Sequence, residues 1–304
     1  MNNCPNFNKI LEIISKKSPM HRNTLAGHFS QRDDKFWERA ETFSTGFLDY
    51  LANEQSSIND AVDAYLEMCQ IMLKEQIKFQ RTGTYSCTNA TEANEQVYSE
   101  EKKMMNYMRG LALSTYLWPN HYLMYDFYLD GLRALKGVSD YLEIGVGHAV
   151  YFIESLRQFP TARFMALDIS PASLKMAAAM ITAFAPKASY KFKETDVANF
   201  NEGTYDYIVM GEVLEHVDDP QTLLRKIHSL LKTGGHFYVT TCANAPAVDH
   251  VYLYDSVDHI RREIKECGFR IDRDLALAVD GSDESKWEKG KTEINYAAFL
   301  SKTP

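Results

Sequence analysis

An acidic residue and three small residues are spaced closely enough to form a ligand-binding turn. Glu143, Gly145, Gly147 and Ala149 occupy alternate positions at the end of the apolar run 141–144. Glycine lets the backbone turn tightly and lets a ligand approach the main chain, and a helix beginning after the turn would point its free N–H groups at that ligand. The spacing therefore predicts a nucleotide-type pocket, against the alternative of a strand–helix turn that binds nothing.

A second carboxylate, Asp168, ends the second predicted strand and could bind a ribose. A carboxylate at this place can accept hydrogen bonds from both ribose hydroxyls, whichever nucleotide carries them. The alternative is that Asp168 caps the following helix, but Ser170 before Pro171 is the better cap and would leave Asp168 free. The dinucleotide pattern Gly-x-Gly-x-x-Gly would need a glycine where Val150 stands, which disfavours a dinucleotide.

Two carboxylates and two imidazoles follow the fourth and fifth predicted strands. Glu212, Glu215 and His216 form a Glu-x-x-Glu-His segment, whose members would share one side of a helical turn, and His250 follows the fifth strand. In a doubly wound sheet both strand ends open onto the same crevice. This set could bind Mg, Mn, Fe or Zn as a divalent ion. The alternative is a hydrogen-bonded pair of Glu212 and His216, with His250 in a solvent loop.

Proton transfer from an acceptor group would need a positioned base. His121, His216 and Glu212 are the candidate catalytic residues, and His250 also qualifies as a base, whereas His148 belongs to the glycine turn itself. His121 lies in the segment Tyr116–Tyr122, where three aromatic residues, a proline, an asparagine and a histidine meet at a helix–helix junction. We interpret this junction as the floor or lid of a substrate pocket, with a buried aromatic hinge as the alternative.

Strand and helix patterns alternate from Ser139 onward, which predicts an α/β fold with a doubly wound, Rossmann-like sheet. Helices are expected after the glycine turn, after Pro171, from Pro220 to Leu231 and after Ser256, and the Gly234–Gly235 turn leads into the fifth strand. The seven expected strands cover about 141–144, 163–167, 189–193, 205–210, 236–241, a segment after Gly268, and 294–300, the last as an antiparallel partner.

The residues before the first strand carry helix signals alone. Asp33–Asp34 and Ser57 are suited to cap helices, Gly83 to end one, and 82–94 is polar and is expected to be a loop. A further helix is expected from about Glu95 to Leu117. Pro119 should break it, and Asn120 should cap a helix from Tyr122 to Leu135. We therefore predict an all-helical cap over residues 1–136 and a nucleotide-binding domain over residues 137–304.

Composition limits the kinds of partner. The chain has 304 residues and a net charge of −8, which disfavours a nucleic-acid partner. Five cysteines without a Cys-x-x-Cys pair are typical of reduced thiols in the cytoplasm. The N-terminal residues contain no long apolar run, so neither a signal peptide nor a membrane span is expected.

The glycine turn resembles motif I of the class I S-adenosylmethionine (SAM) dependent methyltransferases, with Ala149 in place of the usual third glycine. The segments Tyr205–Pro220 and Leu230–Val239 resemble the fourth strand and the approach to the fifth strand of that family. The resemblance extends over about Ser139–Lys302, and the helical region is similar, more loosely, to the substrate caps of small-molecule methyltransferases.

The resemblance implies an enzyme that moves a methyl group from SAM to oxygen or nitrogen of a small molecule, and it leaves a homodimer open. The implied SAM-binding residues are Glu143, Gly145, Gly147, Ala149, Asp168, Ile169, Asp196, Val197 and Gly211. The Glu-x-x-Glu-His segment and His250 are similar to the ion-binding residues of metal-dependent O-methyltransferases of quinone biosynthesis and small-RNA methylation. Two alternatives stay open, an NAD-dependent oxidoreductase and a SAM-binding regulatory protein without catalysis.

Overall fold

One mixed sheet organises the C-terminal part of the protein. The structure, a computed structural model, describes residues 4–93 and 100–303. Its sheet has the strand order β3-β2-β1-β4-β5-β7-β6, in which β7 runs antiparallel to both of its neighbours. The strands are β1 (Asp140–Ile144), β2 (Arg163–Asp168), β3 (Lys191–Glu194), β4 (Tyr205–Gly211), β5 (Leu231–Ala243), β6 (Phe269–Ala278) and β7 (Ile294–Lys302). The prediction of a seven-stranded Rossmann-like sheet with an antiparallel last strand is confirmed.

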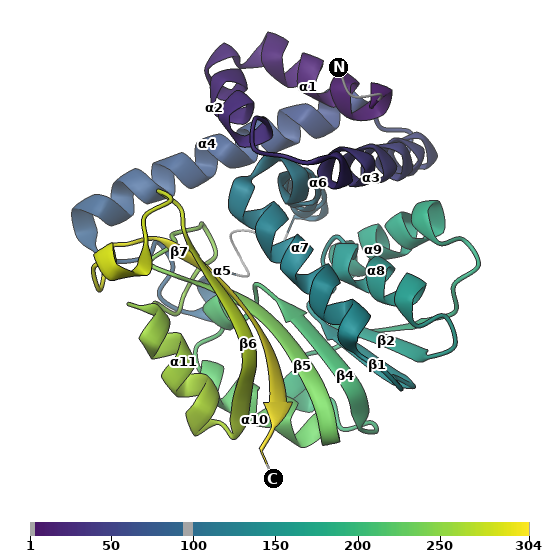
Figure 1. Ribbon diagram of the computed structural model, residues 1–304, viewed down its shortest axis with the longest axis vertical. Helices are drawn as coiled ribbons and strands as arrows, with labels where there is room; N and C mark the ends of the chain where they lie inside the picture. Colours follow the sequence, from purple (N-terminus) through teal and green to yellow (C-terminus); the bar gives the residue numbers. More distant parts are fainter. Residues whose placement is uncertain (1–3, 94–99, 304) are drawn as a thin grey trace.

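Alternate side chains of the central strands are buried on opposite faces of the sheet. Tyr141 and Tyr207 pack into the core that contains α8 (Val150–Gln158) and α9 (Pro171–Phe184). Their neighbours Leu142 and Ile208 pack into a second core with α10 (Pro220–Leu230) and α11 (Val257–Glu266). Figure 1 shows these helices on either side of the sheet. Helices therefore shield both faces of the sheet from water, as expected for strands whose side chains are apolar on both faces.

Seven helices precede the sheet in the described part of the chain. They are α1 (Pro5–Lys17), α2 (Pro19–Phe29), α3 (Asp34–Asn53), α4 (Ile58–Thr82), α5 (Ala90–Ala93), α6 (Glu101–Leu117) and α7 (Pro119–Ala134). The expected caps are present: the Asp33 side chain accepts from Phe36 N, Ser57 forms a capping box with Asp60, and Gly83 is left-handed. Within the described residues, no helix combines the length and apolar character needed to cross a bilayer.

Several local predictions for the helical region and β5 were wrong. Asn120 does not cap a helix, because α7 already begins at Pro119; its side-chain amide instead donates to Leu277 O and Asn295 Oδ1 at 3.2 and 3.0 Å. Helix α2 was not predicted, and α5 interrupts the expected loop. The expected helix start near Glu95 lies outside the described residues. The Gly234–Gly235 turn forms a bulge within β5, since Tyr205 pairs with Leu231 and Tyr207 with His236.

Helix α7 joins the helical region to the sheet. Gly131 faces the ring of Phe299 so closely that an added Cβ would lie 2.1 Å from Cζ. Tyr238 Oη of β5 donates to Met124 O at 3.2 Å, and Tyr128 Oη shares a 2.5 Å hydrogen bond with Ser155 Oγ of α8. One hydrophobic core runs from the N-terminal helices through α7 to this face of the sheet. The domain boundary between residues 136 and 137 stays a prediction. The helical region and the sheet contribute side chains to the same hydrophobic core.

Candidate cofactor and acceptor site

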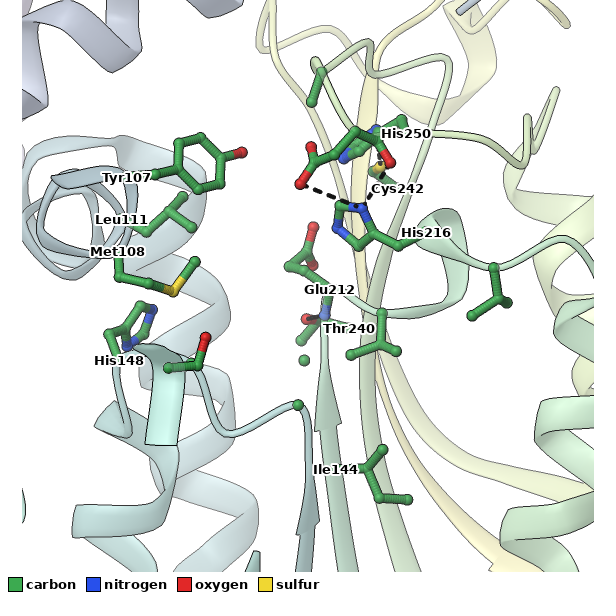
Figure 2. A pocket seen from close by; sticks show the side chains of 18 of the residues that line it. Tyr107, Met108, Leu111, Ile144, His148, Glu212, His216, Thr240, Cys242 and His250 are labelled. Carbon is green, nitrogen blue, oxygen red and sulfur yellow. Dashed lines mark hydrogen bonds and ion pairs between the residues drawn. The ribbon is translucent and has the colours of Figure 1, made fainter. Parts of the chain in front are cut away.

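A cavity of about 850 Å³ opens at the carboxyl ends of the parallel strands. Its floor comes from the ends of β1, β2, β4 and β5, and its roof from α4, α6 and α7. Figure 2 shows two facing walls: Tyr107, Met108 and Leu111 of α6 on one side, and Glu212, His216, Cys242 and His250 on the other. The volume is at the upper end of the range of about 300–1,000 Å³ for small-molecule sites. It therefore leaves room for a nucleotide and a second small molecule.

The glycine turn has the backbone conformation that its sequence predicts. Gly145 and Gly147 have positive φ angles of 71° and 48°, and an added Cβ on Gly145 would lie 2.7 Å from Val213 Cγ2. Ala149 is also left-handed, with φ 61°, and caps α8 from a fully buried position outside the cavity lining. A left-handed alanine is strained, whereas glycine is not. This explains why the motif that the turn resembles has glycine at the third position.

Glu143 lines the cavity from inside β1. Its side chain is buried, and Tyr141 Oη donates a hydrogen bond to Glu143 Oε2. Burial raises the pKa of Glu143 to about 8, against the lowering effect of the tyrosine hydroxyl. A buried carboxyl with this pKa gains most from a cationic or hydrogen-bond-donating ligand, which would stabilise its ionised form.

Asp168 lies beside the glycine turn and is already oriented by two backbone groups. Its Oδ2 accepts from Gly147 N at 3.2 Å and its Oδ1 from Ser170 N at 2.9 Å. Ser170 itself caps α9 by accepting from Ser173 N, as predicted. Asp168 is thus not free, but each carboxylate oxygen keeps a lone pair that can accept from a ribose hydroxyl.

The remaining predicted cofactor residues lie at the rim of the same cavity. Ile169 is 55% exposed, an unusual environment for a large apolar side chain that a planar base would cover. Asp196 caps the short 3-10 helix Val197–Asn199 by accepting from Ala198 N at 2.8 Å, and Val197 is buried. Gly211 ends β4, where an added Cβ would lie 3.0 Å from Tyr151 Cε2. The structure brings eight of the nine predicted residues to one cavity, and the ninth, Ala149, lies outside its lining.

SAM affinity should depend on pH through Asp168. Burial raises the pKa of Asp168 to about 6, despite the lowering effect of its backbone donors. The protonated form has lost acceptor capacity and charge, so the affinity for cationic SAM should rise between about pH 5 and about pH 7, with release of a proton on binding. Calorimetry in buffers of different ionisation enthalpy measures both effects. Asp168→Asn should bind weakly with little dependence on pH over this range, and a flat profile for the unchanged protein would contradict the prediction.

The Glu-x-x-Glu-His segment does not form one helical turn. Glu212 has a left-handed φ of 53° and donates its N–H to Thr240, while the 3-10 helix η3 covers only Leu214–His216. Glu212 Oε1 is buried and accepts no hydrogen bond among the described residues. Burial and then Glu215 raise the pKa of Glu212 well above its ordinary value. The prediction that residues 212, 215 and 216 share one helical side was therefore wrong.

Candidate metal ligands fall into two groups that share His250. Ligand atoms of His216, Asp249 and His250 lie within 4.8 Å of one another, and so do those of Glu215, Cys242 and His250. All three members of the first group line the cavity, whereas Glu215 is fully buried and does not. Glu212 belongs to neither group among the described residues. Sequence reasoning missed Asp249, although it stands directly before His250.

Both imidazoles of the first group are held by backbone carbonyls. His250 Nδ1 donates to Ala245 O at 2.6 Å, and His216 Nδ1 donates to Asp249 O at 3.0 Å. A carbonyl can only accept, so each Nδ1 carries a proton, and the neutral form of each ring has its lone pair on Nε2. Burial lowers the pKa of His250 to about 4 and keeps the ring neutral. This arrangement matches the way proteins orient histidine ligands of metals.

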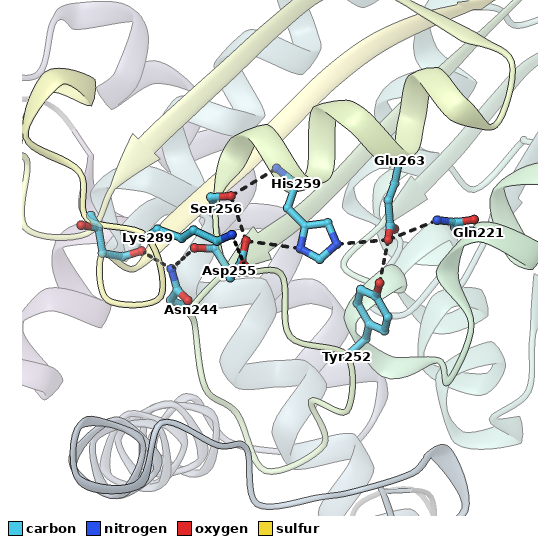
Figure 3. A network of polar contacts seen from close by, with 9 residues as sticks. Gln221, Asn244, Tyr252, Asp255, Ser256, His259, Glu263 and Lys289 are labelled. Atoms are coloured by element: carbon cyan, nitrogen blue, oxygen red, sulfur yellow. Dashed lines mark hydrogen bonds and ion pairs between the residues drawn. The ribbon is translucent and has the colours of Figure 1, made fainter.

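The loop that carries Asp249 and His250 is anchored by a polar network outside the cavity (Figure 3). The Asn244 side chain donates to Asp255 O and Thr292 O at 3.1 and 2.9 Å. His259 lies between Asp255 and Glu263, with N–O distances of 3.4 and 3.2 Å. The N–H groups of residues 251 and 252 also donate to Glu215 O at 2.8 and 3.0 Å. The ends of the loop are therefore fixed to β5, η3 and α11.

Some side chains of the aromatic junction Tyr116–Tyr122 line the cavity, and others are buried in the helical core. His121 and Trp118 line the cavity, and His121 Nδ1 hydrogen-bonds Ser114 Oγ at 2.8 Å. Burial and then His148 lower the pKa of His121 to about 4. Tyr116 and Tyr122, by contrast, are buried in the helical core. His121 can thus accept a proton as a neutral imidazole, across the cavity from the carboxylates.

Comparisons with known proteins agree with this geometry. Residues 142–237 match a family model described as a methyltransferase domain. The chain is 32% identical over 125 residues to malonyl-acyl-carrier-protein O-methyltransferase 1 of Ilyobacter polytropus, covering 41% of this chain and 44% of the relative. It is 31% identical over 107 residues to the ubiquinone biosynthesis O-methyltransferase of Xanthomonas euvesicatoria pv. vesicatoria, covering 35% and 44%. The chain thus spans less than half the length of these curated relatives.

Two solved structures extend the similarity of fold to the helical region. Human N-acetylserotonin methyltransferase in complex with SAM aligns with a TM-score of 0.54 at 16% identity, covering 82% of this chain and 70% of that one. An O-methyltransferase family protein from Burkholderia thailandensis aligns with a TM-score of 0.52 at 13% identity, covering 82% and 74%. At these identities the likeness shows the fold.

The fold, the glycine turn and the family match together define a class I SAM-dependent methyltransferase domain. Residues 142–237 carry a methyltransferase domain, as the motifs predicted, and the oxidoreductase alternative is not favoured.

Proposed function

We propose that this protein transfers a methyl group from SAM to oxygen or nitrogen of a small molecule. The observation that carries the proposal is a cavity with two ends. The glycine turn, Asp168 and Ile169 line one end, and polar and aromatic side chains line the other. SAM supplies an already activated methyl group. The protein must then hold the acceptor in line with the S–CH3 bond and exclude water. A purely regulatory SAM-binding protein would not need the second compartment.

The residues around the glycine turn fit the methyl donor. Gly145 and Gly147 leave space that a side chain would fill. The carboxylate of Glu143 is placed for the cationic amino-acid part of SAM, and that of Asp168 for its ribose. The exposed Ile169 offers an apolar surface to the adenine. The absence of cationic runs and the net charge of −8 support a small molecule rather than a nucleic acid as acceptor. A homodimer and a cytoplasmic location stay predictions.

We further propose that the site binds a divalent metal ion and that His216, Asp249 and His250 are its ligands. Their clustered donor atoms and their orientation by backbone carbonyls fit a transition metal. When bound, such an ion lowers the pKa of a coordinated hydroxyl. Glu212 lines the same cavity, and its buried Oε1 accepts no hydrogen bond among the described residues; it would receive the acceptor proton once a bound ion had stabilised its ionised form. The predicted ligands Glu212 and Glu215 are replaced in this proposal by Asp249.

Removal of the Asp168 carboxylate tests the donor site. Asp168→Ala should weaken SAM binding by roughly 1–3 kcal/mol, because ribose hydroxyls and the Gly147 N–H lose their partner. Calorimetric titration with SAM and with S-adenosylhomocysteine (SAH) measures the change. Glu194→Ala, at the end of the neighbouring strand β3 and exposed, is a matched control that should bind normally. Unchanged SAM affinity in Asp168→Ala would place the ribose elsewhere.

A further inference from the structure

The acceptor end of the cavity is lined by carboxylates from three neighbouring strand ends. Glu212 follows β4, Asp249 lies in the loop after β5, and Glu293 immediately precedes β7. Because β4, β5 and β7 are adjacent in the sheet and β7 is antiparallel, these three residues lie along one edge. This edge continues away from β1 and β2, which carry Glu143 and Asp168. The acids of the acceptor end are therefore separate from those of the donor site.

Positive charge is nearly absent from the same cavity. Among the described residues that line it, Lys226 is the only lysine or arginine, and its ammonium donates to Asn201 near the 3-10 helix Val197–Asn199. Two of the lining histidines, His121 and His148, do not replace it, since burial lowers their pKa values to about 4. Apart from the proposed metal ion, an anionic acceptor would meet several acidic side chains in this compartment and, among the described lining residues, no lysine or arginine beside them.

Glu293 is held at the junction of helical region and sheet. Gln76 Nε2 of α4 donates to Glu293 Oε2 at 2.6 Å, and Glu293 O accepts from Val279 N at 2.9 Å. The preceding residue is fixed as well, because Thr292 O accepts from the Asn244 side chain at 2.9 Å. Burial raises the pKa of Glu293, a cost that a bound cation would relieve. Glu293 belongs to neither metal-competent group among the described residues.

Two further observations point to a ligand on this side. Glu212 Oε1 is buried, lines the cavity and accepts no hydrogen bond among the described residues. Beside the Gln76–Glu293 hydrogen bond, Leu73 and Val279 line the cavity while 55% and 49% exposed. Apolar side chains so exposed next to the half-buried carboxylate of Glu293 are suited to a molecule with an apolar body and a polar, hydrogen-bond-donating end.

We propose that the methyl acceptor is an apolar or aromatic small molecule carrying a basic nitrogen, whose ammonium group pairs with Glu293. This inference rests on the proposed methyltransferase function and names the class of molecule that the acceptor compartment takes. The apolar body lies between Leu73 of α4 and Val279, against the aromatic wall of Tyr107 and Trp118. A carboxylate in place of the nitrogen would be repelled by Glu293, which lies in neither metal-competent group among the described residues.

Three compounds with the same indole ring and two-carbon linker test the charge preference: tryptamine, tryptophol and indole-3-propionate. Each is titrated into the full-length protein saturated with SAH, so that binding is measured without turnover. Tryptamine should bind about tenfold or more tightly than tryptophol, the range expected of a charge-assisted hydrogen bond, and indole-3-propionate should bind weakest. Glu293→Gln should remove the advantage of tryptamine while leaving tryptophol unchanged.

Glu288→Gln provides the matched control. Glu288 lies on the same segment, pairs with Lys291 outside the cavity and should leave all three affinities unchanged. Equal binding of the three compounds, binding of none of them, preferred binding of indole-3-propionate, or a tryptamine preference that survives Glu293→Gln would each overturn the proposal. Saturation with SAH is checked first in the same instrument. Failure of that step refutes the methyltransferase assignment rather than the acceptor class.

Discussion

Exhaustive chelation should abolish methyl transfer, and a divalent ion added back should restore it. The expectation follows from His216, Asp249 and His250, whose ligand atoms lie within 4.8 Å of one another at the cavity wall. Without an ion, neutral Glu212 is a poor base, since burial holds its pKa far above the ordinary value. The acceptor proton would then have no efficient route away. We expect a loss of about a hundredfold or more, measured as SAH formed with and without EDTA.

Variants at single positions distinguish the ion-binding set of the structure from the set that the sequence predicted. His250→Ala and Asp249→Asn should lose both bound metal, by elemental analysis, and methyl transfer, while binding SAM normally. Glu212→Gln should keep the metal, because Glu212 belongs to neither ligand group among the described residues. His236→Ala, near the opposite end of β5, is the control. Activity that survives chelation in a protein free of metal would leave His121 or His216 as the general base.

The glycine turn and the position of Asp168 at the proposed donor site could be predicted from the sequence because their signals are local. The alternation of Glu143, Gly145 and Gly147 encodes a turn whose φ angles only glycine adopts without strain, and the structure has those angles. Asp168 could be placed as well, since a strand that starts after a helix must end at the same edge as β1. In each case, residues close in sequence fix the position of the side chain.

The ligand set around His250 could not be predicted in the same way. Glu212 leaves the helical conformation at φ 53° because its N–H donates to Thr240 O and Oγ1 of the neighbouring strand, a contact between residues far apart in sequence. Asp249 becomes a candidate ligand only because the loop after β5 folds back over η3. Helix α2 escaped prediction for a different reason: only Leu25 and His28 of it are buried, so its sequence lacks a continuous apolar stripe.

A chain that begins at Gly137 should lose acceptor turnover completely. Helices α4, α6 and α7 supply Gln76, Tyr107 and His121 to the cavity, so the acceptor compartment would lose its roof while the glycine turn and Asp168 remain. The same deletion uncovers the face of the sheet where Phe299 and Tyr238 pack against α7, and that exposed apolar surface favours aggregation. Turnover is measured as SAH formation, and donor binding by calorimetry.

Co-expression of residues 1–136 with the shortened chain separates a missing roof from a misfolded sheet. The two pieces share one continuous core, so they should associate and recover part of the turnover. A fragment that stays soluble alone should bind SAM but methylate no acceptor, because nothing then keeps water from the sulfonium or positions the nucleophile. Full turnover by the isolated fragment would show that the acceptor is held by the sheet and its loops, and that the helices serve some other purpose.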